Sequence, residues 1–137
     1  MPDWDVNYAA VLVATVAAMI IGFIWYMPAL AGKTWMAAIG KTEAEIRAGA
    51  KPSIYIAAFV LALLQMTVLA AVLGWAGASG IQDGIVTEVL VWILVFAAIA
   101  LNILFEGRAT ALYWVYGGNS LVTFVIAGAV IGWWRAM

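Results

Sequence analysis

The 137-residue sequence contains no cysteine and no histidine, and charged residues make up only 9% of it. Without cysteine there are no disulfides, thiol nucleophiles or iron–sulfur clusters, and without histidine as well the common zinc sites and histidine-ligated haem are excluded. The side chain best suited to proton transfer near neutral pH is also missing. We therefore expect no metal and no cofactor in this protein.

The shortage of charge also constrains the environment of the chain. An ordinary soluble domain is about 25% charged, whereas 68% of this chain is hydrophobic. A soluble domain of this size needs a polar surface, and too few polar residues are present to make one. The net charge of -1 gives no reason to expect nucleic acid as a partner. We expect the lipid bilayer to be the solvent of most side chains.

Four long apolar segments account for the hydrophobic excess. A helix needs about 20 mostly apolar residues to cross roughly 30 Å of hydrocarbon, and the segments lack the alternation typical of strands in a membrane barrel. The sequence thus predicts an all-α fold, with four transmembrane helices bundled in a single domain. The expected spans are residues 6–27, 54–75, 85–105 and 112–134.

Basic residues predict the orientation of these spans, because Lys and Arg concentrate in cytoplasmic loops. Five of the six would lie on one side of the membrane: Lys33, Lys41, Arg47, Lys51 and Arg108. Only Arg135 would lie on the other side. We therefore expect both termini on the non-cytoplasmic side. The chain begins Met-Pro-Asp-Trp-Asp, which is acidic where a secretory signal is positive, so we expect the first span to be retained.

The connection between the first two spans is expected to carry a short interfacial helix within residues 33–49. Thr42 and Glu45 fit a capping box, which predicts a helix from about residue 43 to 48. Trp35 and other apolar residues alternate with Lys33 and Lys41, as suits a segment in the headgroup layer. A docking surface for a partner is the alternative interpretation.

Small residues at helical spacing predict where helices approach each other, since close packing drives helix association in lipid. The candidates for this packing are Ala10, Ala14, Ala18, Gly22, Gly128 and Gly132. The first four recur every four residues and form one stripe, either within the bundle or between copies of the chain. Alanine is common in this sequence, so some of these spacings arise by chance.

Polar residues inside apolar spans are costly and therefore informative. The candidate polar cluster consists of Gln65, Asn102, Glu106, Arg108 and Asn119. With the expected orientation, all of these except Gln65 fall in the cytoplasmic half. A hairpin between the last two spans could bring those four together. Three interpretations are open: a clasp that fixes the hairpin, a polar path or ligand pocket, and catalysis. Catalysis is the weakest, because a single carboxylate lacks a second acid, a nucleophile or a metal ligand.

Glu88 is the other isolated carboxylate of the spans. It lies one turn inside the predicted start of the third span, and Asp83 is nearby. Acidic residues are favoured at helix N-termini. We therefore expect Glu88 to be a solvated residue at a helix start.

Three stretches of the sequence carry a resemblance to a known family. They read GFIWYMPALAGKTW (Gly22–Trp35), NILFEGR (Asn102–Arg108) and GAVIGWWR (Gly128–Arg135). From about Asn7 to Arg135 the chain resembles small four-span bacterial membrane proteins catalogued as a domain of unknown function, number seventeen sixty-one. The most specific positions are Trp25, Tyr26, Pro28, Gly32, Lys33 and Trp35, followed by Asn102, Phe105, Glu106 and Arg108.

This resemblance implies four spans in one domain of a bacterial inner (plasma) membrane, with the specific positions grouped at the cytoplasmic side. It implies no activity, since none is established for such proteins. Early in the fourth span, relatives usually carry a polar residue flanked by aromatic ones. Here the chain has Gly117-Gly118-Asn119, so this part matches less well.

Three classes of function remain open. The first is a non-enzymatic structural or accessory protein that associates with itself or with a larger membrane complex. The second is an oligomeric pore or carrier for a small solute or ion, with the polar cluster lining its path. The third is a membrane enzyme, which the available residues disfavour. We expect the first, because almost the whole chain lies in spans and little remains for a catalytic domain.

Overall fold

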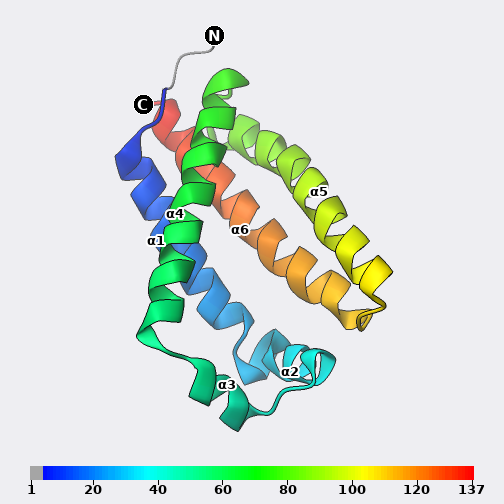
Figure 1. Ribbon diagram of the computed structural model, residues 1–137. Helices are drawn as coiled ribbons and strands as arrows, with labels where there is room; N and C mark the ends of the chain where they lie inside the picture. The colour runs from blue at the N-terminus through cyan, green and yellow to red at the C-terminus, as the bar shows by residue number, and fades with distance from the viewer. Residues whose placement is uncertain (1–4) are drawn as a thin grey trace.

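The structure is a computed structural model, and it describes residues 5–137. Within this range every regular element is helical and no strand occurs. Four helices are long and apolar enough to cross a membrane: α1 (Tyr8–Trp25), α4 (Pro52–Trp75), α5 (Ile81–Glu106) and α6 (Ala111–Arg135) (Figure 1). The predicted all-α fold with four spans is confirmed. Of the acidic N-terminal lead, Met1 to Trp4 lie outside the described residues.

Local chemistry explains where the first two long helices begin. The side chain of Asn7 accepts a hydrogen bond from the backbone N–H of Ala10 at 3.1 Å, which caps α1. Pro52 is the first residue of α4, where its missing N–H and its fixed φ angle fit the first helical turn. Both helices therefore start at residues whose side chains favour a helix N-terminus.

The helix α5 begins at Ile81, earlier than the predicted start at residue 85. The preceding Gly80 has a φ of 98°, which glycine tolerates because it has no Cβ. Its N–H donates a hydrogen bond to the carbonyl oxygen of Gly132 in α6, with an N···O distance of 2.8 Å. This bond fixes the start of α5 against α6 and places Glu88 two turns inside the helix.

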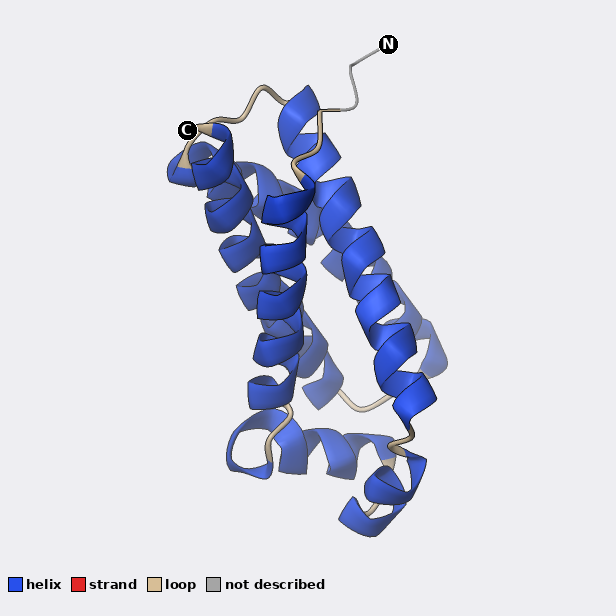
Figure 2. Ribbon diagram, turned by 90° about the vertical axis from the view of Figure 1, so that its left-hand side faces the viewer, coloured by secondary structure: helices blue, strands red, loops and turns tan. Residues whose placement is uncertain are grey.

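Three short elements connect α1 to α4: η1 (Pro28–Gly32), which is a turn kinked at Leu30, α2 (Lys33–Ile39) and α3 (Glu43–Gly49). The predicted cap of α3 is confirmed, because Thr42 Oγ1 accepts a hydrogen bond from the N–H of Glu45 at 3.2 Å. Figure 2 shows α2 running across the ends of the long helices. That direction is the one expected for a helix lying in the headgroup layer.

The central helix of the bundle is α6. It packs most extensively against α5 and also contacts α1, α4 and α2, whereas α4 and α5 touch only slightly. The buried core belongs to α1, α4, the α4–α5 turn and α6: Ala10, Val11, Ala14, Met66, Leu69, Ala70, Leu73, Ala78, Phe124, Ala127 and Ile131. All of these residues lie toward the end of the bundle that holds the described chain termini (Figure 1). We call this half the termini half.

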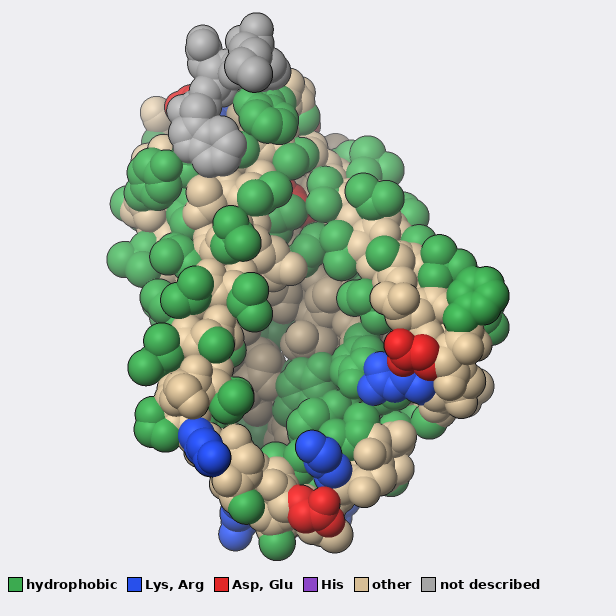
Figure 3. Space-filling model, in the orientation of Figure 1, with side chains coloured by type: hydrophobic (Ala, Val, Ile, Leu, Met, Phe, Trp, Pro, Cys, Tyr) green, Lys and Arg blue, Asp and Glu red, His purple; other side chains and the backbone are tan. Residues whose placement is uncertain are grey.

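The opposite half contains α2, α3 and the α5–α6 turn, and we call it the basic half. Figure 3 shows apolar side chains covering the flanks of the molecule and charged side chains gathered toward its lower, basic end. The same view shows a hollow between α4 and the α5–α6 pair. Many large apolar side chains point outward, including Leu94 and Phe105, which are 72% and 85% exposed. Such flanks suit contact with hydrocarbon rather than water.

Candidate functional site

Trp25, the last residue of α1, makes a polar contact with α6. Its indole N–H donates a hydrogen bond to the carbonyl oxygen of Val115 at 2.9 Å. The ring lies against Gly118, where a Cβ would come within 2.6 Å of ring atom Cζ2. Glycine at position 118 therefore makes room for the indole. The hydrogen bond satisfies the single donor of this side chain.

Trp92 of α5 makes a second contact of the same kind. Its indole N–H lies 3.0 Å from both the carbonyl oxygen of Gly117 and the hydroxyl oxygen of Ser120. The ring of Phe96 stacks on Trp92 with centroids 5.1 Å apart, and it occupies the space that a Cβ on Gly117 would need. The glycine again allows an aromatic ring to approach the α6 backbone.

We call Trp25, Trp92, Phe96, Gly117 and Gly118 the aryl–glycine junction. The sequence assigned Trp25 to the family-specific positions, but it gave no role to Trp92. The glycine pair was noted only as a weaker match. Two adjacent glycines within a span were the available signal, because they leave two neighbouring gaps on a helix surface that large rings can fill.

The remaining family-specific positions of the first segment turn the chain at the end of α1. The rings of Tyr26 and Trp35 meet edge to face with centroids 5.0 Å apart. Pro28 begins η1, and Gly32 packs so closely on the backbone of Tyr26 and Met27 that a Cβ would not fit. Lys33 is exposed at the start of α2. These residues thus shape a tight turn at the basic half.

Glu106 and Arg108 of the predicted polar cluster do lie together. Gly107 between them has a φ of 65° and ends α5. The guanidinium of Arg108 is 3.8 Å from the Glu106 carboxylate and 3.4 Å from the hydroxyl of Tyr116, and it lies over the Tyr116 ring at 5.8 Å. Both charged side chains are partly exposed. The arrangement is a clasp between the end of α5 and the start of α6.

The other three polar residues of the predicted cluster lie apart from this clasp. Asn102 is exposed on α5, and Gln65 is exposed near the middle of α4. Asn119 lies in α6 with its Oδ1 atom buried, and that atom has no hydrogen-bond partner among residues 5–137. None of the hydrogen bonds within the described residues joins any of these three side chains to Glu106 or Arg108.

Three glycines bring the backbones of α5 and α6 into direct contact in the termini half. Gly84 of α5 faces Gly128 and Gly132 of α6, and a Cβ on Gly84 would overlap the carbonyl oxygen of Gly128. We call these three residues the glycine seam. Gly128 and Gly132 thus pack against a helix of the same chain. Their partner, Gly84, was not predicted from the sequence.

Glu88 lies beside this seam, with its Cγ 2.9 Å from the position of a Cβ built on Gly128. The side chain is fully buried, and neither carboxylate oxygen has a hydrogen-bond partner among residues 5–137. The expectation of a solvated Glu88 is therefore wrong, because α5 starts earlier and Glu88 turns toward α6. Its spacing of four residues from Gly84 was the signal for this burial.

A comparison with models of protein families identifies the family of the chain. A model described as "Protein of unknown function (DUF1761)" matches residues 9–132. The chain belongs to the DUF1761 family. The resemblance expected from the sequence is confirmed. No curated protein and no solved structure matches the chain.

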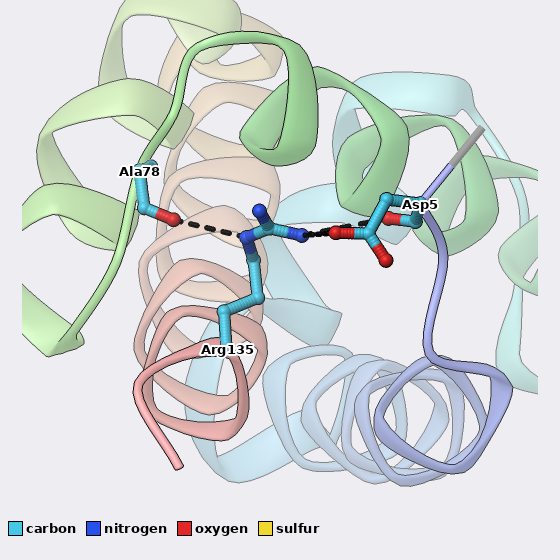
Figure 4. Close-up of polar contacts among 3 residues, drawn as sticks. All are labelled: Asp5, Ala78 and Arg135. Carbon is cyan, nitrogen blue, oxygen red and sulfur yellow. Dashed lines mark hydrogen bonds and ion pairs between the residues drawn. The ribbon is translucent and has the colours of Figure 1, made fainter. Parts of the chain in front are cut away.

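At the termini end of this DUF1761 protein, Arg135 joins three segments (Figure 4). Its Nε–H donates a hydrogen bond to the carbonyl oxygen of Ala78 in the α4–α5 turn at 2.9 Å. One terminal nitrogen lies 3.1 Å from the carboxylate of Asp5, ahead of α1. The side chain of Arg135 is only 20% exposed. The sequence predicted the side on which Arg135 lies but not these contacts.

The polar groups of the DUF1761 bundle thus serve mainly to hold helices together. Indole donors bind carbonyl oxygens of α6, and arginines tie the ends of helices to neighbouring segments. Within residues 5–137 no three His, Cys, Asp or Glu side chains come close enough to hold a metal ion. Four candidate membrane helices and the family match together describe a multi-pass membrane protein of unknown activity.

Proposed function

We propose that this chain is a non-enzymatic membrane protein that works by associating with further copies of itself or with a larger membrane complex. The observation that carries the proposal is the position of Gln65. Its side chain is exposed near the middle of the 24-residue α4, on a flank with the exposed Leu61 and Leu64. It forms no hydrogen bond within residues 5–137.

An amide facing hydrocarbon lacks the water that would satisfy its donors and acceptor. Side chains of this kind draw membrane helices together, contributing about 1–2 kcal/mol in model peptides. Asn102 is a second exposed amide, on α5, which packs along one face against α6 and hardly touches α4. Association would bring both amides into contact with polar partners and would cover the free faces of α4 and α5.

The arrangement of charge supports a definite orientation for this component. Lys33, Lys41, Arg47, Lys51 and Arg108 lie in the basic half, whereas Arg135 lies at the other end. By the distribution of Lys and Arg, the basic half faces the cytoplasm and both termini face away from it. In a bacterial cell the membrane would be the inner membrane.

The second candidate is an oligomeric pore or carrier for a small solute or ion. It is favoured by Glu88 and Asn119, whose buried oxygens have no partner among the described residues. The exposed positions of Gln65 and Asn102 mean that a path lined by the predicted cluster would form only between copies. Association would thus be a requirement of this candidate as well.

The test is the mass of the complex that the full chain forms after purification in a mild detergent. We expect a mass above that of one chain, and we expect Gln65→Leu to weaken the association about tenfold, as 1.4 kcal/mol does. The matched control is Leu64→Ile on the same exposed flank, which should leave the mass unchanged. A single chain with no bound protein, or equal masses for Gln65→Leu and the unaltered chain, would contradict the proposal.

A further inference from the structure

An apolar groove separates α1 from α4 in the basic half. Its volume is about 570 Å³, within the roughly 300–1,000 Å³ that ligand sites commonly occupy. Small residues of both helices, Ala18, Gly22 and Ala58, lie along it. Aromatic side chains form its other walls: Phe23, Tyr26, Trp35 and Tyr55.

The groove exists because the small-residue stripe of α1 loses its partner along the helix. Ala10 and Ala14 are buried in the core of the termini half, whereas a Cβ at Gly22 would have no atom within 4 Å. The rings of Phe23 and Tyr55 stack with centroids 5.8 Å apart and bridge α1 to α4 at this level. Two large rings thus hold the helices apart where alanines would allow closer contact.

Free positive charge gathers at the same end. Each arginine has a carboxylate partner: Arg47 with Glu43, Arg108 with Glu106 and Arg135 with Asp5. The three lysines, Lys33, Lys41 and Lys51, are exposed, and none forms an ion pair within residues 5–137. All three belong to the connection between α1 and α4.

Two of these lysines flank the groove in the sequence. Lys33 precedes the groove residue Trp35 by two positions, and Lys51 caps α4 three positions before the groove residue Ile54. Lys41 lies beyond the far end of α2, separated from it by Gly40. Along the chain, Lys33 and Lys51 are thus each within one helical turn of a residue that lines the groove, at the same end of the bundle as the groove.

We propose that this groove binds an anionic phospholipid, with an acyl chain along Gly22 and the phosphate held by Lys33 and Lys51. The apolar walls suit a hydrocarbon chain, and the surplus of ammonium groups suits a negative headgroup rather than a zwitterionic one. Each basic residue near a membrane surface strengthens the binding of anionic lipid by about 1 kcal/mol. This site is separate from Gln65, so it stands whether or not the chain associates.

The headgroup is tested with the full chain reconstituted in vesicles of equal parts phosphatidylglycerol and phosphatidylcholine. Native mass spectrometry after gentle extraction then counts the retained lipids. We expect phosphatidylglycerol to be retained in preference. Lys33→Gln and Lys51→Gln should each reduce this retention about fivefold, and Lys41→Gln should leave it unchanged. Equal retention of both lipids, or an equal effect of all three substitutions, would overturn the proposal.

The acyl-chain half is tested by Gly22→Leu, which fills the groove from a position with open space. The control is Val16→Leu on the exposed outer face of α1, and circular dichroism confirms that both variants fold. We expect Gly22→Leu alone to abolish preferential retention of phosphatidylglycerol. Unchanged retention in Gly22→Leu would overturn the proposal. So would conversion of dimers to single chains by Gly22→Leu without loss of lipid, because a second copy would then occupy the groove.

Discussion

Along α6, the termini half packs by backbone contact and the basic half packs by aromatic side chains. In the first, Gly84 meets Gly128 and Gly132 with no side chain between the helices. In the second, the aryl–glycine junction places the rings of Trp25 and Phe96 against Gly118 and Gly117. Both contacts depend on glycines of α6. In the glycine seam the backbone of α5 packs against these glycines, whereas in the aryl–glycine junction an aromatic ring packs against each of them.

This difference shows what holds a helix bundle in lipid, where apolar residues gain little by leaving hydrocarbon. Backbone contact brings α5 and α6 closest together, in the same half of the bundle as the buried core. In the basic half a groove remains between α1 and α4, where the rings of Phe23 and Tyr55 stack. The stripe of small residues on α1 extends through both halves: Ala10 and Ala14 are buried in the core, while Ala18 and Gly22 line the groove.

The largest expected effect comes from breaking the glycine seam. Gly84→Ala places a Cβ where the carbonyl oxygen of Gly128 lies, so the helices must separate. We expect the free energy of unfolding to fall by about 3 kcal/mol or more. Unfolding in a mixed-detergent titration, followed by circular dichroism, measures it. Gly22→Ala is the matched control, because it has open space and should raise stability by up to about 1 kcal/mol. Equal effects would refute the contrast between the halves.

Replacing Glu88 tests whether the seam contains an unsatisfied polar group. Glu88→Met keeps an unbranched side chain and removes two buried oxygens that have no partner among the described residues. We expect it to raise the free energy of unfolding by about 1–3 kcal/mol, because the cost of burying the carboxyl group is removed. The same titration measures the change. A loss of stability would instead reveal a partner of Glu88, such as a cation or a second chain.

The aryl–glycine junction should be less sensitive than the seam. Trp25→Phe removes the hydrogen bond to the carbonyl oxygen of Val115 and part of the ring that faces Gly118. We expect a loss of about 1–2 kcal/mol, from one buried hydrogen bond and some contact area. Trp133→Phe is the control, since that ring is half exposed and lies near the other end of α6. Indistinguishable unfolding curves for the two variants would contradict the prediction that the aryl–glycine junction stabilises the bundle.

The smallest effects are expected for the two arginine clasps at opposite ends. Arg135→Gln removes a hydrogen bond and an ion pair of a largely buried side chain, and should cost about 1 kcal/mol. Arg108→Gln removes a longer, exposed ion pair to Glu106, and should cost less than about 0.5 kcal/mol. Thermal unfolding of the two variants compares them. A larger loss of stability for Arg108→Gln than for Arg135→Gln would contradict this order and would mean that Arg108 stabilises more than the α5–α6 turn.

Residue types alone were sufficient to predict the four spans and α3, but not α2 as a separate helix. Runs of apolar residues located four spans, and Thr42 with Glu45 located the start of α3, because both signals act within one element. The start of α5 was misplaced by one turn because a hydrogen bond from Gly80 to Gly132 determines it. This hydrogen bond joins residues far apart in the sequence, so the hydrophobic periodicity of the third span could not predict where α5 begins.

The candidate site was less predictable for the same reason. Glu106 and Arg108 are close in the sequence and do pair, whereas Gln65 and Asn102 turned out to lie on outer surfaces. The direction in which a span turns its polar residue depends on which helices it packs against. The small residues of α1, α5 and α6 hold that information only once their partners are known. Glu88 illustrates this, because its burial follows from the seam beside it.

The most direct test of the four-span account uses the natural absence of cysteine. Ser79→Cys, in the α4–α5 turn, and Lys41→Cys, between α2 and α3, are treated with a membrane-impermeant thiol reagent in intact cells. If α4 crosses the bilayer in the expected orientation, Ser79→Cys is labelled from outside, and Lys41→Cys is labelled only after the membrane is opened. Labelling of both positions from the same side would contradict a bundle whose helices α1, α4, α5 and α6 each cross the bilayer.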